Sequence, residues 1–161
     1  MSDAEESLTK VHIDLPNHWA TGGESLWALP LGNDLYEIRN TPFHAYGINW
    51  GDVVRATEDD PTLKPEVREV VRPSGNKTLR VIFDGALSQE EQDAILSSLE
   101  HLDLSWERAN DHYVAIDVHP NADYHAIRDK LAEFENTGVL GYETCEARVE
   151  GSFDDSPSDE Q

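Results

Sequence analysis

The amino-acid sequence predicts an α+β protein in two parts, a small N-terminal antiparallel β-barrel followed by a ferredoxin-like β-α-β-β-α-β domain. The first part shows short, alternating apolar stretches between turn residues, as the strands of a small barrel do. The second part follows a Pro-Ser-Gly-Asn turn at 73–76, after which stretches of helical periodicity alternate with strands. We therefore expect the barrel at residues 10–73 and the second domain at 78–149, between acidic, disordered ends at 1–9 and 150–161.

Five short strands are expected in the barrel. Alternation at Val11 and Ile13 places both side chains on one face of a first strand. A turn at 32–34 then joins two strands, and Pro42 and Gly47 predict an irregular loop before the fourth strand. The expected strands cover residues 10–15, 24–31, 35–39, 53–54 and 66–72.

The second domain should contain two capped helices among four strands. Ser88 and Glu91, three residues apart, form a capping box at the start of the first helix. Asn121 is the expected cap of the second helix, and Gly138 should end it. The helical stripes are Ile95, Leu99 and Leu102 in the first helix, and Tyr124, Ile127, Leu131 and Phe134 in the second. The expected strands cover residues 78–84, 103–108, 112–118 and 141–149.

Acidic residues dominate the composition, with 33 Asp and Glu against 12 Lys and Arg and a formal net charge of −21. This balance fits a protein that binds basic partners, one that mimics nucleic acid, or one from a cytoplasm with molar salt. At molar salt the Debye length is only about 3 Å, so the self-repulsion of an acidic surface is screened. Because the acid is spread along the whole chain, the sequence favours a halophilic archaeal protein.

A single cysteine, Cys145, excludes an internal disulfide and a zinc site built from cysteines. Its neighbours Glu143 and Glu146 should raise the pKa of the thiol and disfavour a nucleophilic thiolate. No stretch is apolar and long enough for a membrane span, and the first residues do not open a signal peptide. We therefore expect a cytoplasmic protein that does not bind membranes.

Several short motifs occur together: Glu24-Ser25-Leu26-Trp27-Ala28, Asn40-x-Pro42-Phe43, Gly47, Gly51-Asp52-Val53-Val54 and Ser74-Gly75-x-x-Thr78-x-Arg80. With them the chain resembles a bacterial and archaeal family catalogued as a domain of unknown function, over about residues 10–148. Its acidity suggests a haloarchaeal member. The resemblance implies that these positions belong to one unit, and it assigns no activity, catalytic residue or cofactor.

The irregular loop after the third strand holds the main candidate site. His44 lies within the aromatic stretch 42–47, and Asp52 follows a few residues later. Loops on a rigid scaffold commonly carry function, so one interpretation is a ligand-binding loop. In the other interpretation, Phe43 and Tyr46 plug one end of the barrel and Asp52 shapes a turn.

Arg80 alternates with apolar residues in its strand, and we expect it to pair with a partly buried carboxylate, Glu24 or Asp52. The residues expected to bind a ligand or partner are Trp27, Asn40, Phe43, His44, Tyr46, Trp50, Asp52 and Arg80.

A possible metal motif reads D-x-H-x-x-x-D-x-H, from Asp117 and His119 to Asp123 and His125. Carboxylate and imidazole groups can hold a divalent metal. The spacing matches no established ligand motif, and Asp123 also suits the first turn of a helix. The sequence therefore predicts neither a metal nor another cofactor.

The sequence favours a non-enzymatic binding or regulatory module that acts through its aromatic loop on a protein partner or a second copy of itself. No nucleophile elbow or other catalytic spacing occurs. Two alternatives remain open: a hydrolase or nuclease using His44 and Asp52, and a nucleic-acid-associated factor. The net charge disfavours the latter unless salt screens it, and the strand at 112–117 lacks the stacking aromatics and basic start of an RNA-recognition domain.

Overall fold

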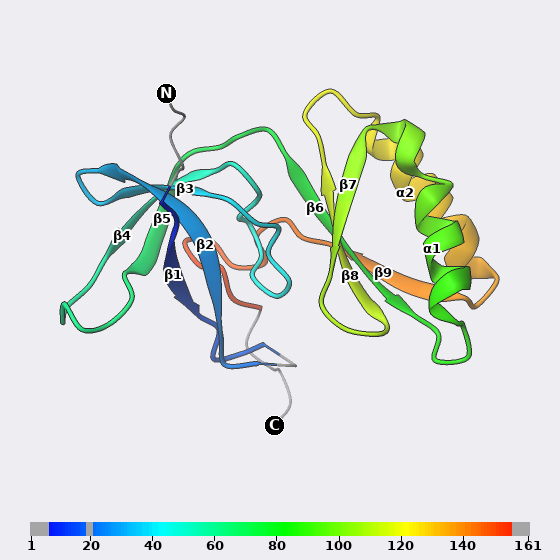
Figure 1. The fold of residues 1–161 in the computed structure, drawn as a ribbon, viewed down its shortest axis with the longest axis horizontal. Helices are drawn as coiled ribbons and strands as arrows, with labels where there is room; N and C mark the ends of the chain where they lie inside the picture. The colour runs from blue at the N-terminus through cyan, green and yellow to red at the C-terminus, as the bar shows by residue number, and fades with distance from the viewer. Residues whose placement is uncertain (1–6, 19–20, 156–161) are drawn as a thin grey trace.

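Two lobes lie side by side in the computed structural model, which describes residues 7–18 and 21–155 (Figure 1). The first lobe is a closed five-stranded barrel. Its strands are β1 (Thr9–Asp14), β2 (Gly23–Gly32), β3 (Leu35–Ile38), β4 (Val53–Thr57) and β5 (Glu66–Arg72). The α+β class and the small barrel expected from the sequence are confirmed.

The sequence predicts a barrel that is antiparallel throughout, and the observed barrel differs in one strand pair. Strands β1 to β5 pair antiparallel in chain order, whereas β1 and β5 close the barrel through a parallel contact between His12 and Glu66. The odd number of strands explains the difference. When five strands alternate in direction, the first and the last run the same way and can only close in parallel.

Strand alternation builds the barrel core. Inward positions of neighbouring strands, such as Val11 on β1 and Leu26 on β2, are fully buried. The β2–β3 turn has the expected residues, with Asn33 at φ 58° and Asp34 at φ 65°. Two consecutive positive φ values suit a tight hairpin whose twist matches the strands, and Asn and Asp tolerate them well.

The second lobe has the element order β-α-β-β-α-β. It comprises β6 (Lys77–Phe83), α1 (Gln89–Ser97), a 3₁₀ turn η1 (Glu100–Leu102), β7 (Leu104–Arg108), β8 (Tyr113–Val118), α2 (Tyr124–Asn136) and β9 (Leu140–Thr144). The strands form one antiparallel sheet in the order β7-β8-β6-β9. Both helices cover the sheet face that points away from the barrel (Figure 1). The barrel lies against the other face.

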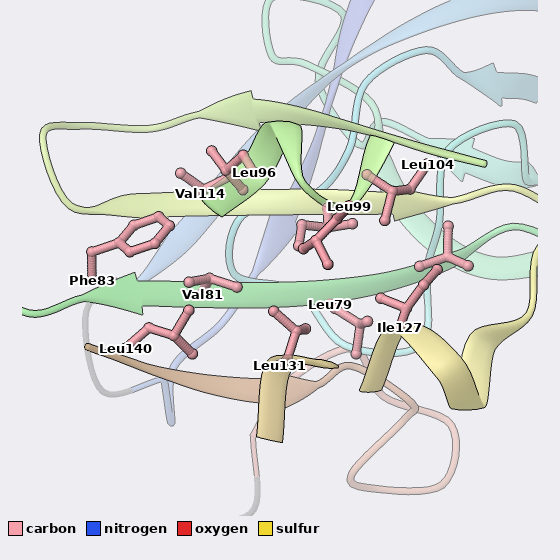
Figure 2. Close-up of a cluster of buried hydrophobic side chains, with 12 residues drawn as sticks. Leu79, Val81, Phe83, Leu96, Leu99, Leu104, Val114, Ile127, Leu131 and Leu140 are labelled. Atoms are coloured by element: carbon pink, nitrogen blue, oxygen red, sulfur yellow. The ribbon is translucent and has the colours of Figure 1, made fainter. Parts of the chain in front are cut away.

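An apolar core fills the space between the helices and the sheet. Figure 2 shows Val81 and Phe83 of β6 in this core with Leu96 of α1 and Leu131 of α2. The alternate residues of β6 point to the opposite face, toward the barrel, and among them Arg80 is fully buried. This alternation places a cation at the centre of the contact between the lobes.

Helix α1 begins at the predicted capping box. Ser88 Oγ accepts the Glu91 amide at 3.1 Å, and the Glu91 carboxylate accepts the Ser88 amide at 2.9 Å. Helix α2 begins two residues later than expected, because its cap is Asp123 and not Asn121. The reason is a turn, closed by the Ala122 amide on the His119 carbonyl, that occupies Asn121.

The C-terminal segment also differs from the expectation. Strand β9 ends at Thr144 instead of continuing to 149, and the chain then returns to the barrel (Figure 1). Phe153 packs against the barrel core, and its carbonyl accepts the Tyr46 amide at 2.9 Å. The apolar side chain thus orders a segment that its acidic composition marked as disordered. Residues 1–6 and 156–161, also expected to be disordered, lie outside the described residues. No described helix has the length and apolarity that a membrane span requires.

Candidate functional site

Residues 39–52, the junction loop, connect β3 to β4 and lie between the two lobes (Figure 1). Glu24, at an inward position of β2, holds this loop from the barrel side. Its carboxylate accepts the consecutive amides of Phe43, His44 and Ala45 at 2.6, 3.0 and 2.9 Å. Amides outside a strand ladder need such partners when they are buried, so Glu24 substitutes for a missing strand.

Arg80 holds the same loop from the side of the second lobe. Its Nη1 donates to the carbonyls of Pro42 and Ala45 at 3.1 and 2.9 Å, and its Nη2 donates to the carbonyl of His44 at 3.1 Å. The remaining Nε donates to the Glu143 carboxylate at 3.1 Å. An arginine can meet this many acceptors at once because its planar fork presents five N–H groups in fixed directions.

The expected pairing of Arg80 with Glu24 or Asp52 is therefore wrong. Its carboxylate partner is Glu143 on β9. Glu24 and Asp52 are both buried, as expected, but backbone amides saturate their oxygens. A sequence does not reveal whether a buried carboxylate will meet a guanidinium or a row of amides.

Tyr46 is enclosed at the centre of the junction. The guanidinium carbons of Arg80 and Arg148 lie 4.7 and 4.3 Å from its ring centroid, within the range of cation–π interaction. Its hydroxyl donates to Glu143 at 2.9 Å. Burial, reinforced by the Glu143 carboxylate, raises the pKa of Tyr46 to about 12. With an exposed fraction of 1%, Tyr46 is unavailable to any molecule outside.

His44 packs among other rings. Its centroid lies 5.8 Å from that of Tyr113 in a stacked arrangement and 4.9 Å from that of His18, edge to face. Burial, followed by the charge of Arg80, lowers the pKa of His44 below its ordinary value. Its Nδ1 is buried without a hydrogen-bond partner. The Tyr113 hydroxyl donates to the carbonyl of Phe43, and this hydrogen bond is a further contact that fixes the loop.

Asp52 fixes the end of the junction loop to the segment that links the lobes. Its two oxygens accept the amides of Asn49 and Ser74, each at 2.8 Å. Burial raises the pKa of Asp52, against the effect of these hydrogen bonds. In the described part of the chain, no hydrogen bond or ion pair joins Asp52 to His44, the pair assigned to a possible hydrolase.

The remaining candidates are one half-buried residue, Asn40, and two exposed tryptophans. Asn40 accepts the Trp27 amide at 2.6 Å and donates to the Thr41 carbonyl at 3.1 Å. Trp27 is 46% exposed and Trp50 is 36% exposed. The fold thus brings Asn40, Phe43, His44, Tyr46, Asp52 and Arg80 together at the junction and leaves both tryptophans at the surface.

A groove of about 290 Å³ opens beside the junction. Ser105 on β7 and Asp117 on β8 are directly paired in register, so both side chains point to its floor. The Asp117 carboxyl accepts Nδ2 of Asn76 at 2.8 Å, and burial raises its pKa. Sequence reasoning overlooked Ser105. The alternation of the strand around it was a usable signal, because it places Ser105 and Glu107 opposite the apolar Leu104.

One cluster of described residues has the geometry to hold a metal ion. Potential ligand atoms of His12, Asp14 and Glu66 lie within 4.8 Å of one another at the seam where the barrel closes. The proposed motif from Asp117 to His125 forms no such cluster within the ranges the structure describes, since Asp123 caps α2 and accepts the Ala126 amide at 3.1 Å.

Cys145 is buried at the junction, and its carbonyl accepts the Gly47 amide at 2.7 Å. Burial, with smaller contributions from Glu143 and Glu146, raises the pKa of the thiol to about 12. Such a thiol stays protonated near neutral pH and is a poor nucleophile.

The family model described as "Domain of unknown function (DUF4265)" matches residues 24–142. The chain belongs to the DUF4265 family. The matched stretch runs from β2 to β9 and so includes Glu24, the junction loop and Arg80, which together join the lobes. None of the curated proteins matches this DUF4265 chain.

A solved structure shares the fold of this DUF4265 protein. It is titled "Novel crystal structure of a hypothetical protein from Neisseria gonorrhoeae" and superposes with a TM-score of 0.72 at 14% sequence identity. The similarity covers 88% of this chain and 96% of the other. A barrel and a helix-covered sheet in this arrangement therefore occur together in a distant sequence.

Proposed function

We propose that this DUF4265 protein is a binding module that docks a protein partner on the outward face of β2. The observation that carries the proposal is the exposure of alternate apolar residues on this strand. Leu26 and Ala28 point inward and are fully buried, whereas Trp27 and Leu31 are each 46% exposed. We call the outward residues Trp27, Leu29 and Leu31 the β2 strip.

The surroundings of the β2 strip extend it and place a lysine beside it, next to an internally neutralised ion pair. Leu8, which continues the outward parity of β1, is 40% exposed. The Lys10 ammonium lies 4.8 Å from the Trp27 ring centroid, and Arg39 pairs with Glu37 at 2.7 Å. Single exposed apolar residues are ordinary on protein surfaces, but a row of them on one strand is typical of an interaction site.

Charge selects the kind of partner. Two copies of a chain with a net charge of −21 repel each other at ordinary ionic strength, which opposes self-association. At that ionic strength a partner that is basic overall is attracted over a longer range, and molar salt screens both the repulsion and the attraction. We therefore assign the β2 strip to such a partner, which presents an apolar segment of its own.

The junction loop, by contrast, supports a structural role for the residues that suggested a hydrolase or nuclease. Asp52 and Glu24 are occupied by backbone amides, and His44 is packed between rings. The net charge argues against a nucleic-acid-associated factor for the same reason that it favours a basic partner.

Two finer proposals concern fold and habitat. The strand order β7-β8-β6-β9, with helices on one face, supports a ferredoxin-like second lobe. The excess of acid supports a protein adapted to molar salt. If so, the melting temperature should rise from physiological to molar KCl as repulsion is screened, and an unchanged or falling melting temperature would argue against halophilic adaptation.

The docking proposal is tested by capture of partners with the immobilised full-length chain, from lysate of the source cells at their native salt concentration. The test variant carries Trp27→Ala and Leu31→Ala. The matched control is Val71→Ala, because Val71 is 50% exposed on β5, which does not neighbour β2. We expect the wild type and the control to retain one stoichiometric protein, and the test variant to lose it.

Capture of the same protein by all three chains, or of none by the wild type, would contradict the proposal. Sedimentation of the purified chain tests whether the β2 strip mediates self-association. A dimer that the test variant abolishes would show that the strip binds a second copy instead of a partner.

A further inference from the structure

Ser105, His119 and Asp103 form a chain of hydrogen-bonding groups at the groove beside the junction. Ser105 Oγ lies 3.2 Å from His119 Nε2, and Asp103 Oδ1 lies 2.7 Å from His119 Nδ1. A hydroxyl within reach of an imidazole that a carboxylate orients is the arrangement that activates a serine nucleophile. We infer that this groove is a hydrolytic site for a small, cationic carboxylic ester, a role separate from docking on the β2 strip.

Asp103 positions the imidazole by two contacts. Besides the side-chain contact, its carbonyl accepts the His119 amide at 3.3 Å. Asp103 follows η1 with a φ of 65°, a conformation that Asp adopts more readily than most residues. With Asp103 accepting the proton on Nδ1, the ring leaves Nε2 free to accept the Ser105 hydroxyl.

Ser105 is open to a substrate from the groove. It is an exposed residue of β7, and β7 is an edge strand of the second sheet. The groove volume of about 290 Å³ suits a small ester, at the lower end of ligand pockets in general. Asn76 Nδ2 lines the same groove and donates to Asp117, which leaves a second amide hydrogen that can meet a developing oxyanion.

The charge of the groove selects the substrate class. Among the described residues that line it, Glu107 and Asp117 are acidic and none is lysine or arginine. These carboxyl groups repel a phosphodiester, which argues against a nuclease at this site. Trp50 lines the same groove, and the face of a tryptophan ring binds cations well. An ester with a quaternary ammonium group fits both features.

The reaction proceeds in two balanced steps. The Ser105 oxygen bonds to the carbonyl carbon while its proton passes to His119 Nε2, and the ester C–O bond breaks as that proton moves to the departing alkoxide. Water then attacks the acyl-serine, gives a proton to His119, and releases the carboxylic acid as that proton returns to Ser105. The Asp117 carboxyl, 3.7 Å from Nε2, lies near the positive charge that the ring carries between proton transfers.

The first test uses a fluorophosphonate, which bonds to an activated serine oxygen and releases fluoride. We expect one phosphonate per chain, located on Ser105 by peptide mass spectrometry and absent from Ser105→Ala. Ser97→Ala is the matched control, because Ser97 is an exposed serine on α1 outside the groove. It should label as the wild type does.

The labelling rate of variants at His119 and Asp103 distinguishes a catalytic role of His119 from a purely structural one. His119→Gln should slow labelling by about 100-fold or more, the usual contribution of a general base. Asp103→Asn, which retains the backbone conformation, should slow it as well. The labelling rate of the wild type should depend on pH, and that of His119→Gln should not. Circular dichroism melts establish that each variant is folded.

The second test compares hydrolysis of acetylthiocholine with that of its uncharged analogue, S-(3,3-dimethylbutyl) thioacetate. We expect the cationic thioester to have the higher kcat/KM, and Glu107→Gln to reduce that preference. Labelling that Ser105→Ala does not abolish, or a rate that His119→Gln leaves unchanged, would overturn the proposed site. Equal kcat/KM values for the two thioesters would overturn the assigned substrate class.

Discussion

The junction loop and the outward face of β2 are both rich in aromatic and apolar residues, yet the fold uses them in opposite ways. The loop buries Tyr46 between the lobes, whereas β2 exposes nearly half of Trp27. The difference follows from backbone hydrogen bonding. Strand β2 pairs with β1 and β3 in the barrel ladder, and Asn40 accepts the Trp27 amide, so its outward side chains are not needed to satisfy its backbone. The loop has no ladder, and charged side chains must satisfy its backbone.

One strand contributes to both regions. Glu24, at an inward position of β2, binds three amides of the loop, and three residues later Trp27 points outward. Inward residues that pack and outward residues that are exposed to solvent therefore alternate along this single strand with a period of two. Substitutions on the two faces should accordingly have different consequences, for stability on the inward face and for binding on the outward face.

The largest effect should come from Arg80→Met. The substitution leaves three loop carbonyls without their donor and Glu143 without its buried partner. Breaking a buried ion pair by removing one member typically costs about 3–5 kcal/mol. We expect a loss of that size in the free energy of unfolding, measured by urea denaturation. Arg55→Met is the control, since Arg55 pairs with Glu69 in solvent and should contribute under about 1 kcal/mol. Equal losses would show that the junction is not the centre of stability.

Alkaline pH should weaken the junction through Tyr46. Because its folded-state pKa of about 12 exceeds the ordinary value of 10.0, the folded protein retains the phenolic proton where the unfolded chain loses it. This contribution is complete below pH 10 and is lost as the pH rises to 12. A two-unit shift corresponds to about 3 kcal/mol. Tyr46→Phe should flatten the fall of unfolding free energy in this window, and a curve parallel to wild type would contradict the assignment.

Glu24→Gln should have an intermediate effect. The amide retains one acceptor oxygen, but its NH₂ group must face an N–H of the loop, which leaves donors unsatisfied. We expect a loss of about 1–3 kcal/mol, the usual cost of an unsatisfied buried polar group. Glu66→Gln is a suitable comparison, because Glu66 accepts the exposed Asp14 amide at the barrel seam. A smaller loss for Glu24 than for Glu66 would oppose the proposed anchoring role.

Trp27→Ala should have the smallest effect on stability. An exposed side chain outside the core usually changes the unfolding free energy by within about 0.5 kcal/mol. Thermal melts of the variant should therefore overlay those of the wild type, while partner capture is lost. A marked drop in melting temperature would mean that the ring supports the barrel instead of a partner.

The sequence identified most of the elements because their signals are local. Strand β5 was expected at 66–72, where it lies, and the Ser88 capping box requires residues only three positions apart. The partners of Arg80 could not be identified, because they come from the junction loop and β9, which only the closed tertiary structure brings together. Phe153 was overlooked for a similar reason, since its acidic neighbours conceal an apolar contact with the barrel.

For the candidate sites too, local signals are readable in the sequence and tertiary contacts are not. The alternation of β7 was a signal for Ser105 that sequence reasoning did not use, and the register that pairs Ser105 with Asp117 is known only from the structure. The contact of His119 with Asp103 depends on a turn with positive φ after η1, which the sequence does not specify. The aromatic loop was recognised as a unit, but whether it faces solvent depends on the second lobe that covers it.

Hydrogen exchange of the amides of Phe43, His44 and Ala45 tests most directly whether the junction loop is an internal framework. If Glu24 and Arg80 hold the loop as described, these amides should open only with global unfolding and exchange as slowly as those of the barrel strands. The exposed β4–β5 turn at 58–60 is the internal reference for fast exchange. Exchange of the three amides at the rate of that turn would contradict the account.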